Sequence, residues 1–167
     1  MHYRFAFDTY DPNEALRGPA KSGGESRKAR RAGQPARSFM QKAKERARTM
    51  LTIDKAKAVA GWLRDKKAID VRAIDVRGLS PITEAFVVAT ATSVRHAQGL
   101  ANHLLDRIAE EKLEYLGMEG FPQGAWILVD LNDVLVHIFQ ADNRGFYNIE
   151  GLWSEGKPIE LPLHEAD

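Results

Sequence analysis

The stretch Trp126–Gln140 constrains the fold of this chain more than any other. It consists of two short apolar runs, rich in β-branched and aromatic residues, on either side of a polar break at residues 130–133. Two such runs around a short polar break predict a β-hairpin. Apolar side chains fall on both alternating faces of each predicted strand, so we expect helices to cover the sheet on both sides. The polar exceptions in the hairpin are Asp130, Asp133 and His137.

The remaining elements follow from the spacing of apolar residues. Thr52 is expected to cap a helix whose apolar residues recur at helical spacing as far as Leu63. The predicted elements after it are, in order, strands at 69–76 and 85–90, a helix at 94–112 capped by Thr92 and Ser93, a strand at 115–119, the hairpin, and a short helix beginning at Asp142 or Asn143. Trp153 is expected to close the domain, and residues 154–167 to form a tail without pattern. This order predicts one α/β (α+β) domain with a mixed sheet flanked by helices.

Charge is distributed unevenly along the chain. Residues 1–48 carry 12 Lys/Arg and 5 Asp/Glu, whereas residues 49–167 carry 12 and 18. The first segment is also interrupted by Gly and Pro and has few aliphatic residues able to anchor a core. We therefore predict a basic, disordered N-terminal extension at 1–48, joined to an acidic domain at 51–153.

The basic extension has three interpretations. Its cluster of Arg27, Lys28, Arg30 and Arg31 would contact RNA weakly, because basic side chains gain affinity by releasing counterions from phosphate. A solvated tail without a specific partner is the plainer interpretation. The third is that translation starts at Met50.

Composition excludes several classes of function. With no cysteine in the chain, disulfides, thiolate catalysis and cysteine metal sites are excluded. No apolar run approaches the roughly 20 residues needed to span a bilayer, and the N-terminus lacks the apolar core of a signal peptide. We expect a cytoplasmic protein that makes no membrane contact.

Acidic residues give only a weak pattern for metal catalysis. In nucleotidyltransferases, paired metal-binding acids follow a Gly-Ser turn, yet here only Glu84 follows Gly78–Ser80, and Phe86 stands where a second acid would point the same way. Asp130 and Asp133 would supply further carboxylates. Such residues are common in turns, however, because they bond to nearby backbone groups.

Histidines and phosphate-binding loops give no better candidate. His96 and His103 lie two helical turns apart, His137 is alone on its strand, and zinc needs a larger set of ligands. No glycine-rich loop with a Walker lysine or a GxGxxG pattern follows a predicted strand. We predict no catalytic residue, no metal site and no cofactor.

The C-terminal third of the chain suits the binding of a protein instead. Aromatic side chains supply desolvated contact area, while carboxylates steer the approach of a basic partner. Both kinds gather in one set: Trp126, Phe139, Tyr147, Leu152 and Trp153 with Glu119, Asp130, Asp133 and Glu150. The alternative, that Trp126 and Trp153 are core residues, stays open. Phe146 and Ile149 are expected in the core.

Several short motifs occur in an order that resembles one known family. They are Asp75-Val76-Arg77-Gly78, Ile82-Thr83, Val87-Val88-Ala89-Thr90, Thr92-Ser93-Val94-Arg95-His96, Trp126-Ile127-Leu128-Val129-Asp130-Leu131, Asp133-Val134, Val136-His137, and Phe146-Tyr147 followed by Leu152-Trp153. Together they make residues 51–153 similar to the Iojap family of ribosomal silencing factors (RsfS). The chain departs from the usual family residues at Glu84-Ala85, Ala91, Asn132 and Gly145.

The resemblance implies a nucleotidyltransferase-like fold that has lost its catalytic metal ligands. It also implies a partner, the large ribosomal subunit, bound through its L-fourteen-class protein at the inter-subunit face. Bound there, the factor would block joining of the small subunit and repress translation under nutrient limitation. Because family members often dimerise in solution, a homodimer is expected as well.

These considerations predict a set of partner-binding residues. We expect the carboxylates of Glu119, Asp130 and Asp133 to meet basic groups, and His137 to orient the hairpin. The expected apolar anchors are Trp126, Leu131, Tyr147 and Trp153. Two alternative functions stay open: a metal-dependent nucleotidyltransferase, and an RNA-binding ribosome-assembly module whose basic extension contacts rRNA.

Overall fold

The computed structural model describes the backbone of residues 35–163 and the side chains of residues 39–42 and 51–163. The chain divides into two compact units, Met1–Met50 and Leu51–Asp167. Helix α1 (Pro35–Asp65) begins in the first unit and ends in the second. Residues 35–48 are thus helical and not disordered as predicted, whereas the basic cluster at 27–31 lies outside the described residues. Between residues 35 and 163, no helix is both long and apolar enough to cross a membrane.

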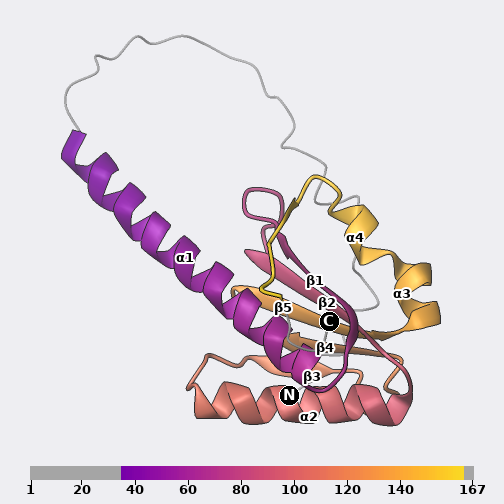
Figure 1. The fold of residues 1–167 in the computed structure, drawn as a ribbon. Coiled ribbons are helices and arrows are strands. Elements are labelled where there is room, and N and C mark those ends of the chain that lie inside the picture. The colour runs from indigo at the N-terminus through magenta and orange to yellow at the C-terminus, as the bar shows by residue number, and fades with distance from the viewer. Residues whose placement is uncertain (1–34, 164–167) are drawn as a thin grey trace. The chain divides into compact units, whose positions relative to one another are not determined.

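The strands in the described part of the chain form one six-stranded sheet, in the order β3-β4-β5-β2-β1-β6 (Figure 1). Their bounds are β1 Ile69–Asp75, β2 Ala85–Ala91, β3 Gly117–Glu119, β4 Trp126–Asp130, β5 Val134–Gln140 and β6 Lys157–Pro158. Strands β2 and β5 run parallel, and the other neighbours run antiparallel. The mixed sheet flanked by helices confirms the predicted fold class. The predicted hairpin is β4–β5, in which Trp126 pairs with Phe139.

One face of the sheet is fully covered by helices. Helix α2 (Val94–Glu110) and the part of α1 within the second unit pack on it, and apolar residues of both helices, such as Leu63 and Leu104, are completely buried. The Ser93 side chain accepts a hydrogen bond from the backbone N–H of His96 (3.1 Å), so Ser93 caps α2 as predicted. Alternate residues of the central strands, including Val87 and Ile138, point into this layer. The main core therefore lies between the sheet, α1 and α2.

The opposite face is only partly covered. Two short helices, α3 (Ala141–Tyr147) and α4 (Ile149–Leu152), follow β5 and pack on part of it. Ile149 is buried there against Val88 and Phe139. A second apolar cluster on this side joins Phe86 and Leu135 with half-buried side chains, among them Leu128 and Trp153. This partly covered face carries the candidate site.

Three local predictions were wrong. Thr52 does not cap a helix, because α1 begins at Pro35 and continues through it. The last helix is broken at Asn148, whose left-handed backbone (φ 43°) separates α3 from α4. Phe146, which we expected in the core, is 81% exposed, whereas Ile149 is buried as predicted.

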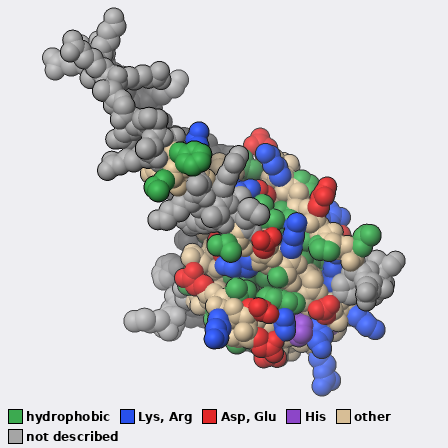
Figure 2. Space-filling model, turned by 60° about the vertical axis from the view of Figure 1, so that its left-hand side comes forward, with side chains coloured by type: hydrophobic (Ala, Val, Ile, Leu, Met, Phe, Trp, Pro, Cys, Tyr) green, Lys and Arg blue, Asp and Glu red, His purple; other side chains and the backbone are tan. Residues whose placement is uncertain are grey.

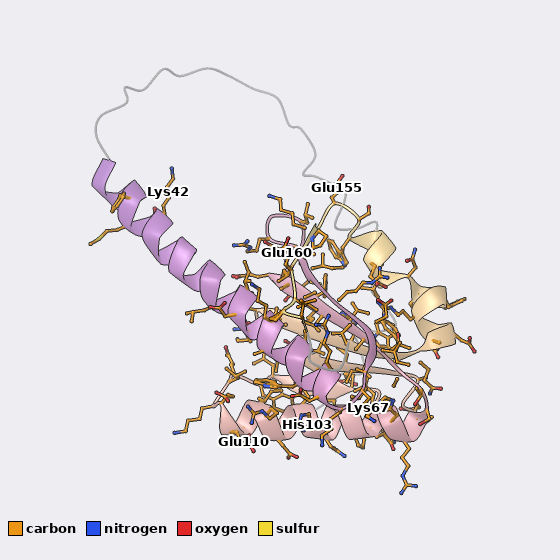
Figure 3. The ribbon with its side chains drawn as sticks, in the orientation of Figure 1. Lys42, Lys67, His103, Glu110, Glu155 and Glu160 are labelled. Carbon is orange, nitrogen blue, oxygen red and sulfur yellow. The ribbon has the colours of Figure 1, made fainter. Side chains whose placement is uncertain are left out.

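The C-terminal segment contains a strand and is not a tail without pattern. Residues 157–158 form β6, which pairs with Ile74 and Asp75 at the edge of β1. The backbone N–H of Ile159 then donates to the carbonyl of Ala73 (2.8 Å), and the Ile159 side chain is buried. Trp153 therefore does not close the domain, because the chain returns to the sheet after it. In Figure 3 the labels Glu155 and Glu160 mark this segment.

Candidate partner-binding surface

Strand register and the helical segment after β5 bring six ring side chains together on the partly covered face. Across the sheet, Trp126 pairs with Phe139, and Phe86 lies beside Leu135 of the neighbouring strand. Because residues paired across neighbouring strands share a face, the register places Phe86, Trp126, His137 and Phe139 on the same side. Tyr147 of α3 and Trp153 after α4 pack onto them. We call this set the aromatic face: Phe86, Trp126, His137, Phe139, Tyr147 and Trp153.

His137 fixes the orientation of Trp126 at the centre of this face. The Trp126 Nε1–H donates to His137 Nδ1 (3.1 Å), and the Trp126 ring stacks on Phe139 with 4.9 Å between ring centroids. Burial lowers the pKa of His137 to about 3, since a charged imidazole would lose its hydration. The ring is therefore neutral near pH 7, and its Nδ1 is free of a proton and able to accept. This geometry fits the expectation that His137 orients the hairpin.

The rings nearest to solvent are contributed by α3 and by the segment after α4. Tyr147 is 43% exposed, and its ring centroid lies 4.6 Å from that of Trp126. Trp153 is half-buried, with its ring 5.5 Å from Phe86. Next to them Phe146 and Leu152 expose large apolar side chains. Exposed apolar area of this kind on a folded domain is typical of surfaces that bind another macromolecule.

The loop before β4 sets the position of Trp126. At Gly120 the backbone has a positive φ (+77°), and a Cβ there would lie 2.0 Å from the carbonyl oxygen of Trp126. Only glycine fits such an approach. At the other end of the loop the Gln140 side-chain amide donates to the carbonyl of Gly124 (3.0 Å), which ties the loop to the end of β5.

Carboxylates line the β3–β4 side of the aromatic face. Glu119 of β3 pairs with Leu128, and Asp130 ends β4. Asp130 Oδ1 accepts from the backbone N–H of Asn132 (2.8 Å), and Asn132 Nδ2 donates to Glu114 (2.9 Å). We call Glu114, Glu119 and Asp130 the acidic rim. Of these residues, sequence analysis selected Glu119 and Asp130 and missed Glu114, whose link to the hairpin turn carries no sequence signal.

The structure moves two predicted residues away from this surface. Leu131 has no exposed surface and lies in the main core, so it cannot anchor a partner. Asp133 turns toward α1: its Oδ2 lies 2.8 Å from the Thr52 hydroxyl, and its Oδ1 accepts from the Lys55 ammonium group. Its carboxylate therefore joins the hairpin turn to α1. We predicted Leu131 as a partner-binding residue from its hydrophobicity, and Asp133 from its negative charge. Neither property reveals which way the side chain of a turn residue points.

Two of the three acids that we considered for metal catalysis, Glu84 and Asp133, meet at this contact with α1, whereas Asp130 does not. The Thr52 hydroxyl lies 2.8 Å from Glu84 Oε2 as well as from Asp133 Oδ2, and Lys55 supplies a cation. Among the residues that the structure describes, no group of three or more His, Asp and Glu side chains is arranged to hold a metal ion. His96 makes backbone contacts instead, with Nδ1 accepting from Thr92 N–H (3.1 Å) and Nε2 lying 2.9 Å from the Lys66 carbonyl.

The fold and this surface define a mixed-sheet protein with one helix-covered face and one face suited to contact with another macromolecule. A family model described as "Ribosomal silencing factor during starvation" (RsfS) matches residues 49–167. The chain therefore belongs to the RsfS family.

Individual relatives agree with this assignment. The chain is 36% identical over 105 residues to the ribosomal silencing factor RsfS of Bacillus subtilis, covering 63% of this chain and 89% of that protein. It is 38% identical over 97 residues to the RsfS of Halalkalibacterium halodurans, covering 58% of this chain and 83% of the relative. A crystal structure of a Chromobacterium violaceum protein is similar, with a TM-score of 0.59 and 32% identity, covering 69% of this chain and 96% of that chain.

Proposed function

We propose that this protein silences ribosomes by binding the large ribosomal subunit through its L-fourteen-class protein. Bound at the inter-subunit face, it would exclude the small subunit sterically and repress translation under nutrient limitation. The observation that carries the proposal is the aromatic face, in which Trp126, Tyr147 and Trp153 are partly exposed beside the acidic rim, on a chain of the RsfS family. Blocking of this kind needs a stable complex and no bond chemistry.

Shape and polarity both support a protein partner. Trp126, Tyr147 and Trp153 combine apolar ring area with a polar atom, the character typical of side chains that dominate interface affinity. The Tyr147 ring packs against Trp126, and the Trp153 ring packs against Phe86 of the sheet, so little side-chain freedom is lost on binding. A standard interface of about 1,600 Å² would extend beyond the aromatic face to include Phe146 and Leu152.

Charge supports a basic partner. The second unit carries 12 Lys/Arg and 18 Asp/Glu, and Glu119 and Asp130 border the rings. Opposite charge speeds the encounter of two proteins and disfavours wrong partners. We propose that Glu119 and Asp130 meet basic groups of the ribosomal protein, with Trp126, Tyr147 and Trp153 as apolar anchors.

The experiment that tests the function uses the full-length protein and isolated ribosomal subunits. In sucrose gradients we expect the protein to sediment with the large subunit, and the yield of joined ribosomes to fall as its concentration rises. Light scattering of the free protein measures its molar mass, which we expect to be that of a homodimer. An undiminished yield of joined ribosomes would contradict the proposal. Magnesium-dependent turnover of a nucleoside triphosphate would favour the nucleotidyltransferase alternative.

A pair of charge reversals tests the proposed surface. Glu119→Lys places a positive charge beside the rings, so we expect it to lower kon for the purified ribosomal protein by about tenfold at low salt. Asp106→Lys makes the same change of charge at an exposed position on α2, and we expect kon to change much less. In Figure 3 the labels His103 and Glu110 mark that helix, which covers the other face of the sheet.

Equal effects of the two reversals would mean that net charge alone governs association. In that case Glu119 is not an interface residue, even if the protein still blocks the joining of the subunits.

A further inference from the structure

Arg144 is a buried cation at the base of the surface just described. It lies on α3 and is 9% exposed. Its Nη1 donates to the carbonyl of Asp70 (2.7 Å) and to the Thr90 hydroxyl (2.8 Å) on strands β1 and β2. Its Nη2 donates to Glu150 Oε1 (2.6 Å), and its Nε to Glu150 Oε2 (3.2 Å). One guanidinium thus joins α3, α4 and two strands, and we call these contacts the Arg144 network.

Apart from the Arg144 network, α3 and α4 are attached mainly by Ile149, buried against Val88 and Phe139, and by the Tyr147 ring on Trp126. They are seven and four residues long, well below the length at which a helix is stable by itself. The N-cap of α3 makes no side-chain hydrogen bond, and Asn148 interrupts the pair. Their buried side chains are Arg144 and Ile149, whereas Phe146, Tyr147 and Leu152 are exposed. Polar contacts of Arg144 therefore hold in place a segment whose apolar residues largely face solvent.

We propose that Arg144 is a positioning residue for partner binding. It presents α3 and α4 in one arrangement, with Tyr147 held against Trp126 and Trp153 against Phe86, before the partner arrives. This inference rests on the proposed function of the aromatic face. A surface that is already ordered loses less conformational entropy on binding.

The geometry requires arginine and not just a positive charge. A guanidinium offers five donors in a planar fork, which here reach a carboxylate, a hydroxyl and a backbone carbonyl together. A lysine ammonium is a single point and cannot span all of them. Glu150 also has Arg72 nearby (3.6 Å), so its charge keeps one partner when Arg144 is replaced.

The test compares Arg144→Lys with a matched control, Arg107→Lys. Both variants preserve net charge, so long-range steering stays the same. Arg107 pairs with Glu110 on α2 and with Glu111 at its C-terminal cap, away from the aromatic face. For the purified L-fourteen-class protein, we expect Arg144→Lys to raise koff by about tenfold with little change in kon, and Arg107→Lys to change neither by more than about twofold.

Hydrogen exchange of the free protein supplies the second readout. In Arg144→Lys, amides of residues 141–153 should exchange about tenfold faster, because that segment opens more often, while amides of β5 and α2 keep their protection. Thr90→Val removes one hydrogen bond of the Arg144 network and should give a smaller change in the same direction. Thr90→Val replaces Arg144→Lys in both measurements if Arg144→Lys fails to fold.

The outcomes separate the two proposals. Unchanged exchange at 141–153, or an unchanged koff, would overturn the positioning role. If the unmodified protein fails to bind the ribosomal protein, the proposed function falls, and the exchange comparison by itself decides whether Arg144 orders α3 and α4.

Discussion

His137 links the packing of the aromatic face to pH. Burial holds its pKa at about 3 in the folded chain, whereas an unfolded histidine titrates near 6.5. Between these values the unfolded state binds a proton that the folded state does not, so stability is fully present above about pH 6.5 and falls as the pH is lowered.

This shift gives the first prediction. Lowering the pH from 6.5 to 5 should reduce the free energy of unfolding by about 2 kcal/mol through His137, because each pH unit in this range contributes about 1.4 kcal/mol. Urea unfolding at several pH values measures it. The control is His137→Gln, which keeps an acceptor for Trp126 but does not titrate, and which should lose less stability over the same range. Equal losses in both proteins would show that His137 is already solvated in the folded state.

At the scale of single residues, the sequence predicts the chemical type of a surface residue better than the direction in which its side chain points. The crowding of rings and carboxylates in the C-terminal third identified Trp126, Tyr147 and Glu119 as members of one surface. It also selected Leu131, which the core buries, and Asp133, which faces Lys55. Whether a residue at the end of a strand points outward depends on the path of the turn, and Asn132 adopts a positive φ (74°) there.

Among the elements, α1 and the hairpin turn are joined by a small polar contact. Lys55 and Asp133 are 15% and 16% exposed at their side chains, and the Thr52 hydroxyl lies between Asp133 and Glu84. Removing one partner from a poorly solvated ion pair leaves the other charge without compensation, which costs more than the pair itself contributes.

The second prediction concerns this contact. Lys55→Met should lower the free energy of unfolding by about 1–3 kcal/mol, because the Asp133 carboxylate loses its cation. Urea denaturation of the purified protein measures the change. Lys66→Met removes the same charge at an exposed position just after α1, and should change stability by less than about 0.5 kcal/mol. The double variant Lys55→Met/Asp133→Asn should recover part of the loss, and its failure to do so would assign the effect to apolar packing of the lysine stem.

Sequence identified most of the elements because their apolar residues alternate or recur at helical spacing. The hairpin, β2 and α2 are long and strongly patterned, and each lies within a residue or two of its predicted bounds. Strand β6 was missed because two residues are too few to show alternation. The break at Asn148 was missed because nothing in the surrounding sequence marks it, and it turns Phe146 out of the core.

Over the whole molecule, the two units differ in the sign of their net charge. The first 48 residues have an excess of Lys and Arg, and the rest has an excess of Asp and Glu. Figure 2 shows acidic and basic side chains interspersed with hydrophobic ones on the face that it presents. A basic segment gains affinity for RNA by releasing counterions, whereas an acidic domain is suited to a basic protein. The two units therefore differ in the kind of macromolecule that their charge would attract.

The third prediction separates these contributions by comparing the full chain with one beginning at Met50. The shorter chain contains the second compact unit and nearly all of the family match, so we expect it to fold. If the aromatic face supplies most of the affinity, the shorter chain should keep its binding to the large subunit within about tenfold, with affinity that depends less on salt. Co-sedimentation at low and high salt measures both quantities. Abolished binding would instead make the basic extension the principal contact, through rRNA, and would favour the RNA-binding alternative over a protein interface.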